Sequence, residues 1–226
     1  MSRTAPRAAA LIVVVALAAL LFWPEPPPKA TGGWLTRAGL TPHFETIEGL
    51  RVRYVRGGAG SSVILVHGLA SSIYTWRHVW PALAADHDVV ALDLPGFGGS
   101  EQPRDLSAEV LPRVVRGLAD RLGIRRAALV GHSLGGCVAV MVASEEPDRV
   151  TRLALLDPAG FNLAPADLPW LLRVAGSPAG RVLEVFPARR ALVRLGLGQV
   201  FHDDSKLGPE DVEEYWAPLA RPGALA

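Results

Sequence analysis

Four short apolar runs rich in β-branched residues recur along this chain, and segments with helical spacing separate them. Such runs are typical of strands that are covered on both faces of a sheet. Strand and helix therefore alternate as in βαβ units, which predicts an α/β fold with a mostly parallel sheet flanked by helices. The runs lie at 62–68, 87–100, 125–133 and 150–160, and the helical patterns between them at 73–86, 107–124 and 134–146.

Two further strands are predicted before these runs, at 44–49 and 50–58, where apolar and polar residues alternate. The predicted core therefore has six strands over residues 43–160. Residues 161–226 have short helical patches broken by prolines and glycines, and we interpret them as a partial helical cap.

The N-terminus differs from the rest of the chain. Arg3 and Arg7 precede sixteen apolar residues, 8–23, which contain no charge. This pattern predicts a signal anchor over residues 1–23, with a cleaved signal peptide and a buried helix as alternatives. Arginines on the near side place the domain outside the cytoplasm, in the periplasm or at the cell surface, or secreted if the segment is cleaved. Residues 24–42 are expected to form a Pro-rich linker that holds the domain off the bilayer.

Charge and cysteine content exclude several classes of partner. The formal net charge is +1, and no block of like charges suggests nucleic-acid binding. The single cysteine, Cys137, excludes an internal disulfide and a multi-cysteine metal site. We expect no metal and no organic cofactor.

Ser133 lies between two glycines, Gly131 and Gly135, where an apolar strand pattern meets a helical one. A residue in such a sharp turn exposes its hydroxyl at the carboxyl end of the sheet, where ligands bind. The glycines are required because neighbouring chain segments pass close to the turn. The first N–H groups of the following helix could stabilise a negative oxygen. The alternative is a plain turn serine.

Four motifs in order resemble the α/β-hydrolase fold family, in its serine-nucleophile branch with a helical cap: "VHGLASS", "DLPGFGGS", "GHSLGG" and "LLDPAG". The resemblance covers about residues 44–226. It implies that Ser133 is the nucleophile and that the backbone N–H groups of Leu69 and Leu134 form the oxyanion hole. Serine at this position argues against the dehalogenase and epoxide-hydrolase branches, which carry aspartate there.

The resemblance further implies a serine hydrolase that acts, through an acyl-enzyme, on an ester or related acyl substrate. Cleavage of a thioester, lactone, amide or C–C bond, and transfer of the acyl group to an alcohol, stay open as alternatives. The residues after 160 are rich in Leu, Val, Trp and Phe, which favours a small apolar acyl substrate.

The motifs do not identify the base and the acid that would complete a catalytic triad with Ser133. In this family the acid and then the histidine follow the serine. Only His202 follows Ser133, and it lies in the cap; Asp157 is a candidate acid at the end of a strand. His67 is expected to shape the oxyanion loop and Asp93 to fix its own loop.

The family has eight strands, so we expect the last two, with the usual acid and histidine, to lie beyond Ala226. The strand at 150–157 would then be an apolar edge through which the chain self-associates. A catalytically inactive, truncated hydrolase domain, acting at most as a binding surface, is the alternative function.

Overall fold

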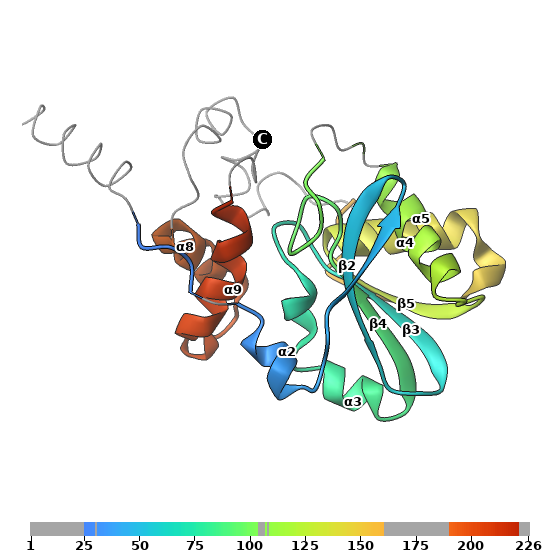
Figure 1. Cartoon of the computed structure of the whole chain (residues 1–226), viewed down its shortest axis with the longest axis horizontal. Coiled ribbons are helices and arrows are strands. Elements are labelled where there is room, and N and C mark those ends of the chain that lie inside the picture. Colours follow the sequence, from blue (N-terminus) through green and yellow to red (C-terminus); the bar gives the residue numbers. More distant parts are fainter. Residues whose placement is uncertain (1–24, 30, 104–106, 108, 161–189, 222–226) are drawn as a thin grey trace, which may run out of the picture.

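The computed structural model describes residues 25–29, 31–103, 107, 109–160 and 190–221 (Figure 1). The expected signal anchor or signal peptide at 1–23 lies outside these residues, as does most of the first half of the expected cap. Within the described ranges, no helix is long and apolar enough to cross a membrane.

All six predicted strands are present and form one sheet in the order β1-β2-β4-β3-β5-β6. β1, β2 and β4 pair antiparallel, whereas β4, β3, β5 and β6 run parallel to one another. The strands are β1 (His43–Ile47), β2 (Leu50–Gly57), β3 (Ser61–Val66), β4 (His87–Leu92), β5 (Ala127–His132) and β6 (Val150–Leu156). The mostly parallel sheet with flanking helices is thereby confirmed.

Helices cover both faces of the sheet, because alternate strand residues point to opposite sides. α4 (Val110–Arg121) and α5 (Leu134–Glu145) pack on one face, against residues such as Ile64 and Val66. The other face buries Val63 and Leu65 under α2 (Gly33–Arg37), α3 (Trp80–Ala84) and a 3-10 turn, η1 (Ile73–Trp76). A second short turn, η2 (Pro147–Arg149), joins α5 to β6.

Three local expectations change in the structure. The pattern at 73–86 forms η1 and α3 rather than one helix; Ser72 accepts the Tyr74 N–H at 3.2 Å, which closes a separate turn, and Pro81 starts α3. α4 begins at Val110, so Pro112 lies in its first turn, where proline is tolerated. The range 24–42, expected to be only a linker, contains α2, whose Trp34 is buried.

The described part of the cap consists of α8 (Arg190–Val200), η4 (Asp204–Lys206) and α9 (Pro209–Leu219). α8 and α9 pack together at the end of the molecule nearest α2 (Figure 1). Tyr74 of η1 donates a hydrogen bond of 2.8 Å to Asp211 of α9, and the hydroxyls of Thr75 and Tyr215 are 2.9 Å apart. The cap helices therefore rest on the turn that follows β3.

β6 lies at one edge of the sheet, and no described strand pairs with its outer side. Its apolar side chains are open to solvent: Leu153, Leu155 and Leu156 are 40%, 37% and 46% exposed. An apolar edge strand of this kind can pair with another chain.

Candidate active site

Ser133 lies in the one-residue turn between β5 and α5. Its φ is +50° and its ψ is −117°, a conformation that costs a non-glycine residue about 1–3 kcal/mol. Backbone hydrogen bonds hold this turn from several sides. The Ser133 N–H donates to the Leu156 carbonyl of β6 at 2.9 Å, and the Ser133 carbonyl accepts from Gly136 and Ala159, also at 2.9 Å.

The glycines on either side of Ser133 are required by space. A Cβ at Gly131 would lie 2.4 Å from the Gly135 carbonyl oxygen, and one at Gly135 would lie 2.1 Å from the Val66 carbonyl oxygen. No side chain fits at such distances, so the predicted close approach is confirmed. The start of α5 therefore packs directly against the end of β3, where the loop that follows β3 begins.

That loop, residues 67–72, runs beside the serine. A Cβ at Gly68 would lie 3.1 Å from the Cβ of Ser133 and 3.0 Å from Nδ1 of His132. Leu69 follows with its side chain 54% exposed at the tip of the loop. Leu134 is the first residue of α5, so its N–H has no acceptor within the helix. Leu69 therefore follows the residue that lies beside Ser133, and Leu134 follows Ser133 itself.

His67 is part of the framework of this loop. Its side chain is fully buried; Nδ1 donates to the Gly68 carbonyl at 2.7 Å, and Nε2 accepts from the Leu94 N–H at 3.0 Å. Burial lowers the pKa of this imidazole, which favours the neutral ring that both hydrogen bonds require. Neither nitrogen is free to take a proton from a serine.

Asp93 has a wider role than fixing its own loop. Its fully buried carboxylate accepts hydrogen bonds from the N–H groups of Ile73 at 2.7 Å and Gly99 at 2.6 Å, and from Nε of Arg53 at 2.5 Å. It therefore joins β2, the loop after β3 and the loop after β4. The parallel pairing of β3 with β4 brings their ends together, which is the signal that could have revealed this contact from the sequence.

The two remaining candidates for a catalytic acid or base are Asp157 and His202. Asp157, at φ +43°, is exposed just after β6 and electrostatically favours a proton on His132. Burial is the larger effect and lowers the pKa of His132, whose Nδ1 is buried without a hydrogen-bond partner among the described residues. His202 is exposed between α8 and η4.

The six histidines all belong to the part of the chain that the structure describes, and none of their rings is hydrogen-bonded to the Ser133 hydroxyl. Within the same residues, no group of three or more His, Cys, Asp or Glu side chains could hold a metal ion.

Comparisons with known proteins place this chain in a family. The model of the alpha/beta hydrolase fold matches residues 61–193. The chain is 40% identical over 119 residues to a soluble epoxide hydrolase of Corynebacterium sp., which covers 52% of this chain and 42% of that protein. It is 33% identical over 165 residues to the 2-hydroxymuconate semialdehyde hydrolase of Pseudomonas sp., covering 70% and 58%.

Among solved structures, a bacterial membrane phospholipase A is similar with a TM-score of 0.65 and 25% identity, over 97% of this chain and 70% of that one. The chain spans less than two thirds of the length of both curated relatives. The family match covers more than half of the chain and includes β3, the Ser133 turn and β6. This chain belongs to the α/β-hydrolase fold family.

Proposed function

We propose that this chain is a serine hydrolase that acts on an ester or related acyl substrate, with Ser133 as the nucleophile. The observation that carries the proposal is the strained turn at Ser133, at φ +50° between a parallel strand and a helix and directly beside Gly68. A serine in this position is typical of a nucleophile elbow. Its similarity to the epoxide hydrolase and to the 2-hydroxymuconate semialdehyde hydrolase supports hydrolysis as the class of reaction.

In the proposed reaction, the Ser133 oxygen attacks the acyl carbon while its proton passes to a base. The carbonyl oxygen becomes an anion, and the N–H groups of Leu69 and Leu134 donate hydrogen bonds to it. Collapse of this intermediate expels the alcohol, which takes up the proton, and leaves an ester on Ser133. Water then attacks this ester, which releases the acid and restores the hydroxyl. Amides held in place before the reaction stabilise the anion without reorganisation.

The positions of the histidines favour a second candidate function. In it, the chain is a catalytically inactive hydrolase domain that acts at most as a binding surface. Among the residues that the structure describes, which include all six histidines, no imidazole is hydrogen-bonded to Ser133. Loss of the base from such a site lowers turnover by about a million-fold, leaving what binding and the oxyanion hole supply. A measurement on Ser133 itself is therefore needed to separate the two functions.

Labelling of the full chain with a fluorophosphonate provides that measurement. Serine hydrolysis predicts one label per chain, lost in Ser133→Ala and kept in Ser61→Ala, a change of an exposed serine at the start of β3. Folded protein that takes up no label would contradict the proposal and favour the binding function.

We further propose that residues 1–23 anchor the chain in a membrane with its domain outside the cytoplasm, and that the substrate is a small apolar acyl compound. The apolar run after Arg3 and Arg7 supports the anchor, as does the likeness to a membrane phospholipase A over 97% of the chain. Protease accessibility in intact spheroplasts tests the orientation. A domain that is digested only after lysis would contradict it, and a chain in the soluble extracytoplasmic fraction would indicate cleavage of the segment.

A further inference from the structure

The segment that follows the apolar run is held on the cap helices. The Glu25 carboxylate accepts a hydrogen bond of 3.3 Å from the N–H of Arg190 and lies 3.6 Å from its guanidinium. Four residues later, the Lys29 N–H donates to Glu213 of α9 at 3.2 Å. Glu25, two residues after the apolar run 8–23, therefore contacts the first residue of α8.

Further contacts make this attachment firm. Arg190 donates from Nε to Glu213 at 2.6 Å, and its guanidinium lies 4.0 Å from the centre of the Trp216 ring. Burial raises the pKa of Glu213, but its hydrogen bonds with Arg190 and Lys29 outweigh burial and hold that pKa below its ordinary value. Gly32, at the end of the segment, donates to Glu214, also on α9, at 2.5 Å.

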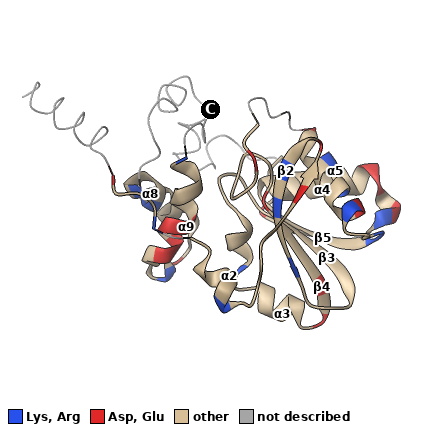
Figure 2. Ribbon diagram, viewed as in Figure 1, with Lys and Arg blue, Asp and Glu red and all other residues tan. Residues whose placement is uncertain are grey.

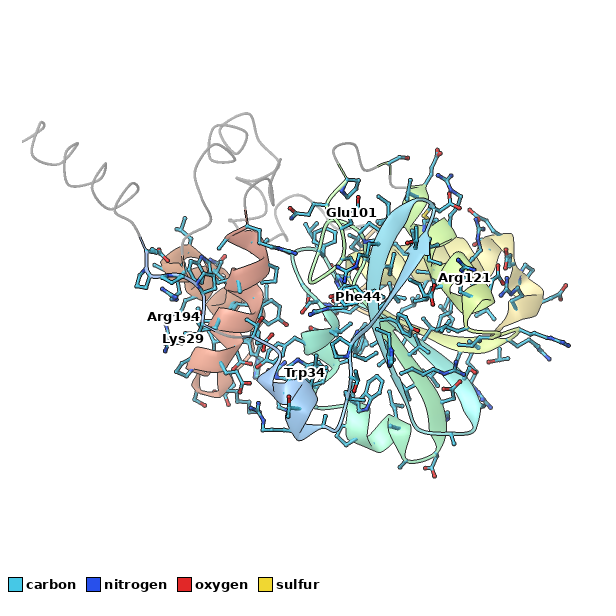
Figure 3. The ribbon with its side chains drawn as sticks, viewed as in Figure 1. Lys29, Trp34, Phe44, Glu101, Arg121 and Arg194 are labelled. Carbon is cyan, nitrogen blue, oxygen red and sulfur yellow. The ribbon has the colours of Figure 1, made fainter. Side chains whose placement is uncertain are left out.

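α8 has a side that packs toward α9 and several exposed apolar residues. Val193 and Leu197 of the helix, and Phe201 just after it, pack toward α9. Leu192, Leu195 and Val200 are 42%, 49% and 61% exposed, and we call these three residues the α8 surface. The helix carries Arg190 and Arg194 and no acidic residue. In Figure 2 the acidic colour lies on α9, and Figure 3 shows Arg194 and Lys29 on the side of this helix pair away from the sheet.

The position of Glu25 indicates what covers the α8 surface. Glu25 is two residues after Trp23, the last residue of the apolar run, and it contacts the start of α8. A run that enters a bilayer at residue 23 therefore brings α8 to the surface of that bilayer. Exposed leucines and a valine together with the basic side chains of Arg194 and Lys29 suit a lipid surface with anionic headgroups.

We propose that α8 docks on the bilayer, with Leu192, Leu195 and Val200 in contact with lipid and Arg194 and Lys29 beside the headgroups. This proposal rests on the membrane anchor proposed above. It turns the cap end of the domain toward the membrane and the η2 end, with Asp148, away from it (Figure 1). The linker then holds the domain against the bilayer rather than away from it.

Lipid-borne quenching tests the orientation in the full chain. An environment-sensitive fluorophore is attached at Leu195→Cys or, as a matched control, at Asp148→Cys, each in a Cys137→Ala background. The protein is reconstituted into phosphatidylcholine vesicles that contain a minority of phosphatidylglycerol and a spin-labelled lipid. We expect quenching at position 195 to exceed quenching at position 148 several-fold, and Leu192→Glu to remove the difference.

Each other outcome overturns the proposal. Equal, weak quenching at both positions in vesicle-bound protein would show that lipid does not cover α8. Changes at 195 that depend on protein concentration, and not on the quencher, would show that a second copy covers it. Failure to bind vesicles would remove the anchor together with this proposal. Labelling of Ser133 by the fluorophosphonate is read separately, so the hydrolase proposal stands or fails independently.

Discussion

The buried carboxylate of Asp93 accepts a hydrogen bond of 2.7 Å from the backbone N–H of Ile73. This contact fixes the end of the segment that carries Leu69, and the contacts to Gly99 and Arg53 fix the position of Asp93 itself. The proposed oxyanion loop is therefore positioned by a residue that follows the neighbouring strand β4, in addition to its own sequence.

Asp93→Asn is expected to loosen this loop. The amide of asparagine would turn a donor either toward Ile73, which donates to one carboxylate oxygen of Asp93, or toward Gly99 and Arg53, which both donate to the other. In either case the partly buried Arg53 guanidinium loses its anionic partner. We expect the free energy of unfolding to fall by about 3 kcal/mol, measured by urea denaturation. Asp88→Asn is the control, because Asp88 pairs with the partly exposed Arg56 and its loss should cost about 1 kcal/mol. Equal losses in the two variants would contradict the assigned role of Asp93.

Gly135→Ala tests the packing of α5 on β3. The new methyl group would lie 2.1 Å from the Val66 carbonyl, so the helix and the strand must separate. We expect a loss of about 4 kcal/mol or no folded protein, as for other severe overpacking. Gly123→Ala is the comparison: its new methyl group meets no atom within 4 Å, so it should cost only the backbone strain of φ +71°, about 1–2 kcal/mol. Similar thermal midpoints for both variants would refute the steric argument.

Ser133→Gly should be more stable than Ser133→Ala. Glycine relieves about 1–3 kcal/mol of backbone strain at φ +50° and loses about 0.5–1 kcal/mol to the entropy of the unfolded chain. The difference favours glycine by about 1 kcal/mol in thermal or urea unfolding. Neither variant should take up the fluorophosphonate. An alanine variant of equal or greater stability would show that the turn is not strained.

Protonation of His67 should lower the free energy of unfolding in mild acid. Burial holds its pKa below the ordinary value of 6.5, so the unfolded chain binds a proton on this residue before the folded chain does. Its contribution to stability is present above about pH 6.5 and is lost as the pH falls toward the lower folded pKa. His67→Gln should reduce the difference between urea midpoints at about pH 7.5 and about pH 5.5. His78→Gln, which changes an exposed side chain, should keep the full difference.

The β6 edge is expected to cause self-association. Leu153→Lys together with Leu155→Lys places charges on the exposed strand, and charged edges resist pairing. In detergent, light scattering after size exclusion should give a smaller species for this variant than for the unchanged chain. Leu195→Lys on α8 is the control and should leave the size unchanged. If the control alone reduces the size, the interface lies on the cap instead.

The strands could be predicted from the sequence because burial on both faces leaves an unmistakable run of apolar residues, as in 62–68. The space requirement at Gly131 and Gly135 could also be predicted, since it follows from a strand-to-helix turn. Contacts between distant residues could not. Asp93 reaches Arg53, forty positions away, and Glu25 reaches Arg190, 165 positions away. No local sequence pattern indicates either contact. The sequence therefore predicts a linker without contacts to the cap, whereas Glu25 and Lys29 bind the cap helices.

The proposed oxyanion hole uses the backbone N–H of Leu69, a residue that is 54% exposed. A protein engineer who wants new substrates can therefore randomise this side chain, because its amide contribution does not depend on what the Cβ carries. Libraries that also vary residues 66–68 or 131–136 would consist mostly of variants that cannot form the closely packed turn at Ser133.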